Sequence, residues 1–192
     1  MSCAGLVLLG LLTQAPPPRV DLQLAFVYGY GSRSSFGGAL DVTVGWPVWE
    51  RGGAAGTLEA GLLAGYQNEP YSQTAAALAP LVVTGSNHRV EVFAVAGHTV
   101  RFPSSGRLSV GLQLFAGWTQ LAMRGSLTDA ARGVSGSYRA DAADFTFGLL
   151  ASVGVRVSDR VSIVARGVVP VPYAGIAVSS YFMVSLGASL RL

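Results

Sequence analysis

The chain of 192 residues contains no lysine, and only 12% of its residues are charged. A soluble domain has about twice that share. The chain therefore has too few charged side chains to cover a fully hydrated surface. Long apolar runs are missing too: no segment approaches the roughly 18 residues that a membrane-spanning helix needs. Because 51% of the residues are nevertheless hydrophobic, the apolar side chains must follow a pattern other than long helices.

Cysteine and histidine are also scarce. The one cysteine, Cys3, lies before a predicted cleavage point, so the mature chain has no disulfide. The two histidines, His88 and His98, are too far apart on one strand to form a metal site. The net charge of +3 comes from scattered arginines, whereas a nucleic-acid binder shows a clustered basic stripe. We therefore expect no cofactor, no metal and no nucleic-acid partner.

The chain does have a regular alternation of apolar and polar residues, with a period of two. In the segment from Arg107 to Leu121 every second side chain is apolar, which predicts a strand with one apolar face. Its length exceeds the usual soluble strand of about 5 or 6 residues and suffices to cross a bilayer. The apolar set is Leu108, Val110, Leu112, Leu114, Ala116 and Trp118.

The same pattern recurs eight times. Because a structure that spans lipid without helices must pair every backbone group, we predict an all-β fold, an eight-stranded antiparallel up-and-down transmembrane β-barrel. The predicted strands cover residues 21–30, about 40–46, 58–66, 89–102, 107–121, about 144–157, 161 to about 170, and 178–192.

The N-terminus has the features of a secretory signal. A short apolar stretch, residues 6–12, precedes Thr13, Gln14 and Ala15, and three prolines follow. We predict a signal peptide over residues 1–15 and the barrel over residues 16–192.

The predicted connections alternate in length. Pro47 is expected to end the second strand, and the links after the second, fourth and sixth strands are short. Residues 67–87 are interpreted as a long loop with a helical turn or a strand extension, because Pro80 interrupts their apolar part, and residues 122–138 as a second long loop. Short periplasmic turns and longer outer loops are typical of such barrels.

The polar face indicates which side meets the lipid. It is rich in Gly, Ser and Thr with isolated charges, which suits a narrow interior better than a soluble exterior. We expect the interior charges to pair in a polar network, and Asp21 to meet Arg191 where the first and last strands close the barrel. The network residues are Asp41, Glu59, Arg89, Glu91, Arg156, Arg166 and Arg191.

Together with its last strand, VSLGASLRL, this pattern resembles the family of small eight-stranded outer-membrane β-barrel proteins. The resemblance implies an outer-membrane location in a Gram-negative cell envelope, contact with outer-membrane lipid and lipopolysaccharide, and a monomer. An interior of this size is nearly filled by side chains, so a wide porin-like pore is not expected.

The leading functional hypothesis is a non-enzymatic protein with a structural or surface-binding role through its extracellular loops. Arg33, Arg124, Arg132 and Arg139, all predicted in outer loops, could meet lipopolysaccharide phosphates or remain solvated.

Three alternatives remain open, and one of them is a narrow channel through the barrel. A lipid A-modifying enzyme would use His and Ser on a lipid-facing strand, but His98 has Val100 where that site would have serine, and His88 is interpreted as a loop residue. A soluble lipocalin-like carrier of an apolar ligand would have its apolar face inside.

Overall fold

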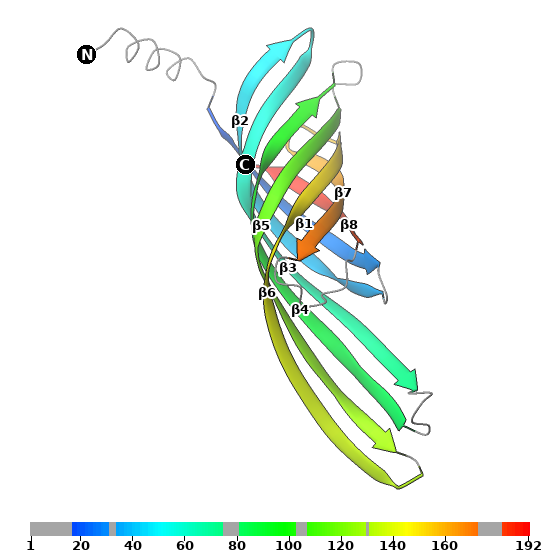
Figure 1. Ribbon diagram of the computed structural model, residues 1–192. Coiled ribbons are helices and arrows are strands. Elements are labelled where there is room, and N and C mark those ends of the chain that lie inside the picture. The colour runs from blue at the N-terminus through cyan, green and yellow to red at the C-terminus, as the bar shows by residue number, and fades with distance from the viewer. Residues whose placement is uncertain (1–16, 31–33, 75–80, 103–106, 130, 173–181) are drawn as a thin grey trace, which may run out of the picture.

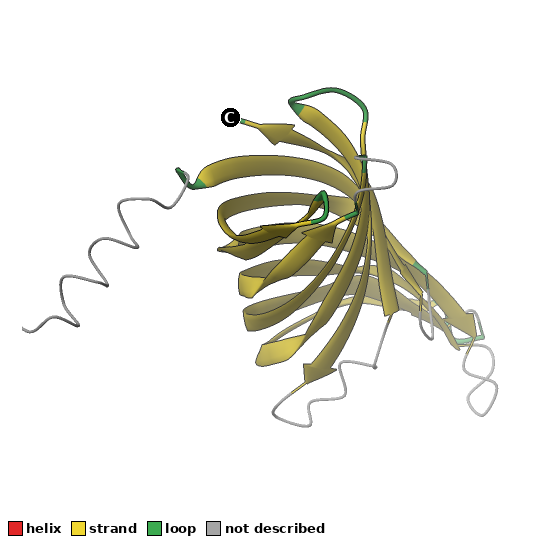
Figure 2. Cartoon of the chain, turned by 90° about the horizontal axis from the view of Figure 1, so that it is seen from above, coloured by secondary structure: helices red, strands yellow, loops and turns green. Residues whose placement is uncertain are grey.

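A computed structural model describes residues 17–30, 34–74, 81–102, 107–129, 131–172 and 182–192. Eight antiparallel strands follow one another around a closed barrel (Figure 1), which is seen from above in Figure 2. The eight-stranded barrel predicted from the alternation is confirmed, whereas the predicted leader lies outside the described residues. The strands are β1 (Arg19–Tyr30), β2 (Ser35–Arg51), β3 (Ala54–Thr74), β4 (Leu81–Arg101), β5 (Leu108–Asp129), β6 (Val134–Arg156), β7 (Val161–Pro172) and β8 (Phe182–Arg191).

The apolar face of the barrel is on the outside. Leu24, Leu62 and Leu114 are more than 60% exposed, whereas Asp41 and Gln113 on the other face are at most 3% exposed. An exterior of this kind is stable in lipid and unstable in water. The soluble lipocalin-like alternative is therefore wrong. Among the described residues, no helix is long and apolar enough to cross a bilayer.

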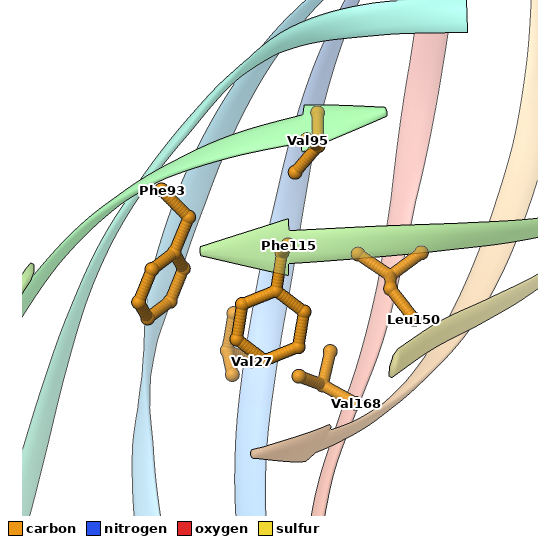
Figure 3. Packing of buried hydrophobic residues seen from close by; sticks show 6 residues of the cluster. All are labelled: Val27, Phe93, Val95, Phe115, Leu150 and Val168. Carbon is orange, nitrogen blue, oxygen red and sulfur yellow. The ribbon is translucent and has the colours of Figure 1, made fainter. Parts of the chain in front are cut away.

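An apolar layer fills part of the interior. Six buried side chains from five strands point toward one another there (Figure 3), and two of them, Phe93 and Phe115, pack with ring centroids 4.8 Å apart. The layer lies among polar side chains of the interior, and Val27 and Val168 line one small cavity together with Gln67, Glu91 and Arg166. Its members are Val27, Phe93, Val95, Phe115, Leu150 and Val168.

Strands β3 to β6 continue well beyond the others at the end of the barrel opposite the termini (Figure 1). They have 21 to 23 residues each, whereas β1, β7 and β8 have 10 to 12. A tilted strand crosses the membrane with about 9 to 11 residues. The rest of β3 to β6 therefore forms a sheet outside the membrane, which we call the strand extension.

The predicted long loop at residues 67–87 is largely strand. β3 continues to Thr74, β4 begins at Leu81, and the two pair throughout, with Pro70 opposite Ser86. β2 pairs with β3 only as far as Asn68, so beyond that point β3 is an edge strand. Proline is tolerated on an edge because its missing N–H leaves no ladder bond broken. Pro80 lies outside the described residues.

The prediction of a loop at residues 122–138 is also wrong. β5 runs to Asp129 and β6 begins at Val134, with a tight turn between them. In that turn the Asp129 carboxylate accepts hydrogen bonds from the backbone N–H groups of Ala131 and Arg132. The segment lacks apolar alternation because neither face of the strand extension meets lipid, so a period of two in hydropathy is not required there.

Pro47 does not end β2. The ladder with β3 shifts register between Pro47 and Trp49 and then continues to Arg51. β1 pairs with β2 only as far as Gly45, so Pro47 also lies on an edge, next to a bulge.

The turns at the end that carries the termini are short. Gly52 and Gly53 connect β2 and β3 with positive φ angles of 58° and 79°, which glycine adopts without strain. Short turns face the periplasm in bacterial outer-membrane barrels, so this is the periplasmic end and the strand extension is extracellular.

The apolar layer should contribute strongly to stability. We expect Leu150→Ala to destabilise the barrel by about 2 to 5 kcal/mol, because Leu150 is 1% exposed and its truncation leaves a cavity. Leu114→Ala is the matched control, since Leu114 is 66% exposed and its truncated site is filled by lipid. The measurement is urea unfolding in lipid vesicles, and equal losses in the two variants would contradict the assigned faces.

Candidate functional site

The seven charged residues predicted for the interior face inward. Asp41, Arg89 and Glu91 are buried, and the other four line a cavity near the periplasmic mouth. Those four are Glu59, Arg156, Arg166 and Arg191.

Two ion pairs on the inner face connect different strands. Arg166 Nη1 lies 2.5 Å from Asp41 Oδ2, with both side chains almost fully buried. Arg191 Nε lies 3.4 Å from Asp21 Oδ1, where β1 and β8 close the ring. The second is the pair expected from barrel closure, because residues 21 and 191 are direct partners in the ladder.

A second polar group lies toward the extracellular side. Arg89 Nε is 4.0 Å from Glu91 Oε1, and Gln67 Nε2 donates to Glu91 Oε2 at 3.3 Å. Ser35 donates to the Gln67 side chain at 2.8 Å, so the group spans β2, β3 and β4. Sequence reasoning missed Ser35 and Gln67, since neither is charged and their contact depends on the register of three strands.

Glu59 and Arg156 do not form an ion pair with each other. Gln113 Nε2 donates to Glu59 Oε2 at 2.8 Å, a partner that the sequence did not reveal. Arg156 lies beside Arg107, whose backbone oxygen accepts from the Arg156 N–H at 2.8 Å.

The outer face of the strand extension carries two opposed arginines. Arg124 of β5 and Arg139 of β6 are direct cross-strand partners, and both are exposed. Like charges directly opposite one another destabilise a sheet. Arg139 Nε is compensated by Asp141 Oδ2 at 3.0 Å. Arg124 has no ion pair among the residues that the structure describes.

A hydrogen-bonded group lies beside these arginines. His88 Nδ1 is 2.7 Å from the Tyr66 hydroxyl, and His88 Nε2 is 2.9 Å from Ser86 Oγ. Ser86 is the direct cross-strand partner of Arg124. The interpretation of His88 as a loop residue is therefore wrong: it lies on β4, and the pairing of β3 with β4 places Tyr66 within reach.

An open apolar groove of about 630 Å³ lies on the barrel wall below this group. Tyr66 belongs to both features, and the other side chains are mostly apolar residues that face the lipid. The main lining residues are Leu24, Phe26, Leu40, Tyr66, Val90 and Val92.

The remaining candidate residues are not gathered at this site. His98 lies toward the periplasmic end and stacks with Trp49 at a centroid distance of 6.2 Å. Arg132 is in the β5–β6 turn near Asp129, and Arg33 lies outside the described residues. No group of three or more metal-ligating side chains occurs in the part of the chain that the structure describes.

Several solved structures are similar to this chain. The major outer membrane protein of Thermus thermophilus has a TM-score of 0.60 and 12% identity, covering 92% of this chain and 100% of that one. Neisserial surface protein A has a TM-score of 0.40 and 13% identity, covering 93% and 97%. Ail of Yersinia pestis has a TM-score of 0.45 and 10% identity, covering 91% and 97%. No protein-family model and no curated protein matches the chain.

The closed ring, its apolar exterior and the likeness to the Thermus protein define the class. The chain has the fold of a small eight-stranded outer-membrane β-barrel. With this fold and this exterior, it is assigned to the outer membrane of a Gram-negative-type envelope.

The buried ion pair should be the most sensitive part of the interior. We expect Asp41→Asn and Arg166→Gln each to destabilise the barrel by about 3 kcal/mol, because each leaves the other charged group buried and uncompensated. The double variant should lose less stability than the sum of the losses in the two single variants. The measurement is a double-mutant cycle from unfolding in vesicles. Strictly additive losses would show that the two groups are not coupled.

Proposed function

We propose that the protein is a non-enzymatic outer-membrane barrel whose strand extension binds phosphate groups of lipopolysaccharide at the cell surface. The supporting observation is the opposed pair Arg124 and Arg139, which has one carboxylate for two guanidinium groups. An anion between them removes the repulsion that the ladder register imposes.

The position of the two arginines favours the same ligand. Arg124 is on the same face of β5 as the lipid-exposed Trp118, further along the strand toward its extracellular end. Tryptophan and tyrosine mark the membrane interface, so Arg124 and Arg139 lie on the headgroup side of it. Guanidinium groups bind phosphate with two parallel hydrogen bonds, which makes arginine suited to this contact.

The proposal predicts a loss of lipopolysaccharide binding in the variant R124Q/R139Q. We expect the affinity of the protein in nanodiscs for immobilised lipopolysaccharide to fall at least tenfold, because charge-assisted hydrogen bonds are worth about 1.5 to 3 kcal/mol each. The control is R132Q, which removes the arginine of the nearby turn. Enzymatically dephosphorylated lipopolysaccharide should bind wild type and the double variant alike. Unchanged binding of the double variant to the phosphorylated form would refute the proposal.

A second candidate function is the hydrolysis of a lipid ester at Ser86. Nucleophile, base and orienting group have the required order of contacts: Ser86 Oγ to His88 Nε2, and His88 Nδ1 to the Tyr66 hydroxyl. The apolar groove beside Tyr66 has room for an acyl chain. In this reaction Ser86 Oγ attacks the acyl carbonyl while His88 takes its proton, the alcohol leaves, and water releases the acyl group.

The second candidate predicts covalent labelling of Ser86 by a fluorophosphonate. Wild-type protein in detergent should react, and S86A and H88A should not. The matched control is S126A, since Ser126 lies on the same outer face and shares a 3.0 Å hydrogen bond with Thr84. The absence of labelling in folded wild type, with folding shown by the gel shift on boiling, would exclude this function and leave the binding role.

A further inference from the structure

The apolar groove on the barrel wall crosses β1 to β4 on the face that meets lipid. It follows two neighbouring rows of direct cross-strand partners. The smallest residues of the two rows, Gly38 and Ala64, lie on adjacent strands and form the floor of the groove. The row nearer the extracellular side is Phe26, Gly38, Tyr66 and Val90, and the next row is Leu24, Leu40, Ala64 and Val92.

Gly38 is not required by the fold. A Cβ placed on it would meet no atom closer than 3.7 Å, which is an ordinary contact, and its φ is not positive. The adjacent Gly37 differs, because a Cβ there would collide with the backbone oxygen of Tyr66. A glycine inside a strand often marks a place where a ligand approaches the backbone closely. Gly38 therefore leaves a space on the outer wall that a molecule outside the barrel can fill.

The width of the groove at Gly38 favours a single hydrocarbon chain. Phe26 and Tyr66 flank Gly38 from strands that are two apart, so their backbones are separated by roughly 9.5 Å. An α-helix with its side chains is about 10 to 12 Å across, which is too wide for this gap. An acyl chain is much narrower, and the membrane supplies acyl chains on this face.

The extracellular end of the groove leads to polar groups. Tyr66 lines the groove, and its hydroxyl lies 2.7 Å from His88 Nδ1. His88 in turn contacts Ser86, the cross-strand partner of Arg124. A lipid whose acyl chain lies in the groove therefore has its polar part beside these residues.

The spacing between the groove and the arginines favours a lipid with a large headgroup. On β4 the groove ends at Val90, and Ser86, which shares a row with Arg124, is four residues nearer the extracellular end. Four residues of strand span roughly 13 Å. The glycerol linker of an ordinary phospholipid is shorter than this, whereas lipopolysaccharide carries its phosphates on sugars.

We propose that the groove holds one acyl chain of the lipopolysaccharide whose phosphate group Arg124 and Arg139 bind. This inference rests on the proposed surface function and adds the lipid part of the ligand to it. It involves no bond cleavage, so it is separate from hydrolysis at Ser86. Gly38 and Ala64 determine the affinity, because they leave the space that the chain fills.

The test fills the groove with side chains of the protein itself. Rough lipopolysaccharide, and the same material after removal of its acyl chains, are each titrated onto the full chain in detergent, and bound molecules are counted by native mass spectrometry. The variants G38L and A64L fill the floor of the groove from two strands. The control A151L enlarges another exposed alanine of the lipid-facing wall, on β6. R124Q/R139Q tests the phosphate contact separately, and the gel shift on boiling checks that each variant is folded.

Intact lipopolysaccharide should bind wild type and A151L alike, and G38L and A64L at least tenfold more weakly. The acyl-free form should bind wild type and G38L equally, since it has no chain for the groove. Weakening in G38L and A64L but not in R124Q/R139Q would support the groove and refute the phosphate contact. Weakening in R124Q/R139Q but in neither groove variant would overturn this inference and leave the proposed function intact. Equal weakening in G38L and A151L, or a wild-type dimer that G38L converts to a monomer, would also overturn it.

Discussion

The need to pair every backbone N–H and C=O inside the hydrocarbon of a membrane governs this structure. Strands meet that need only when the sheet has no free edge, so β1 must pair with β8, and it does so from Asp21 to Tyr30. Closure in turn places alternate side chains inside and outside. The apolar set meets lipid, and the polar set must find its partners within a narrow interior. The ion pair of Asp41 with Arg166 and the Gln67 contacts follow from that confinement.

Beyond the membrane the same strands can have free edges, because water there can pair with their backbone groups. In the strand extension β3 and β6 become edges, both faces meet water, and the sequence there can carry proline, glycine and charge. Pro70 and Arg124 would each be costly inside the bilayer, yet both occur in continuous strands. The long pairing of β4 with β5 and of β5 with β6 presents these groups on paired strands. A binding site on such strands is better ordered than one on a loop.

The barrel therefore places its arginines in two different environments. At the extracellular end the arginines are neighbours in one sheet and exposed to the headgroup region. At the periplasmic end they converge from different strands on one small cavity.

The alternation of the sequence determined the strand number, the antiparallel order, the outward and inward sets and the meeting of Asp21 with Arg191, because a period of two and a closed ring leave few other arrangements. Hydropathy could not reveal the strand extension at residues 122–138, since side chains that meet water on both faces carry no period. The contacts of His88 with Tyr66 and Ser86, of Gln113 with Glu59, and of Arg124 with Arg139 were decided by the tertiary structure. Each depends on the register between strands or on the shear of the ring, and register is a property of the folded sheet rather than of any one segment.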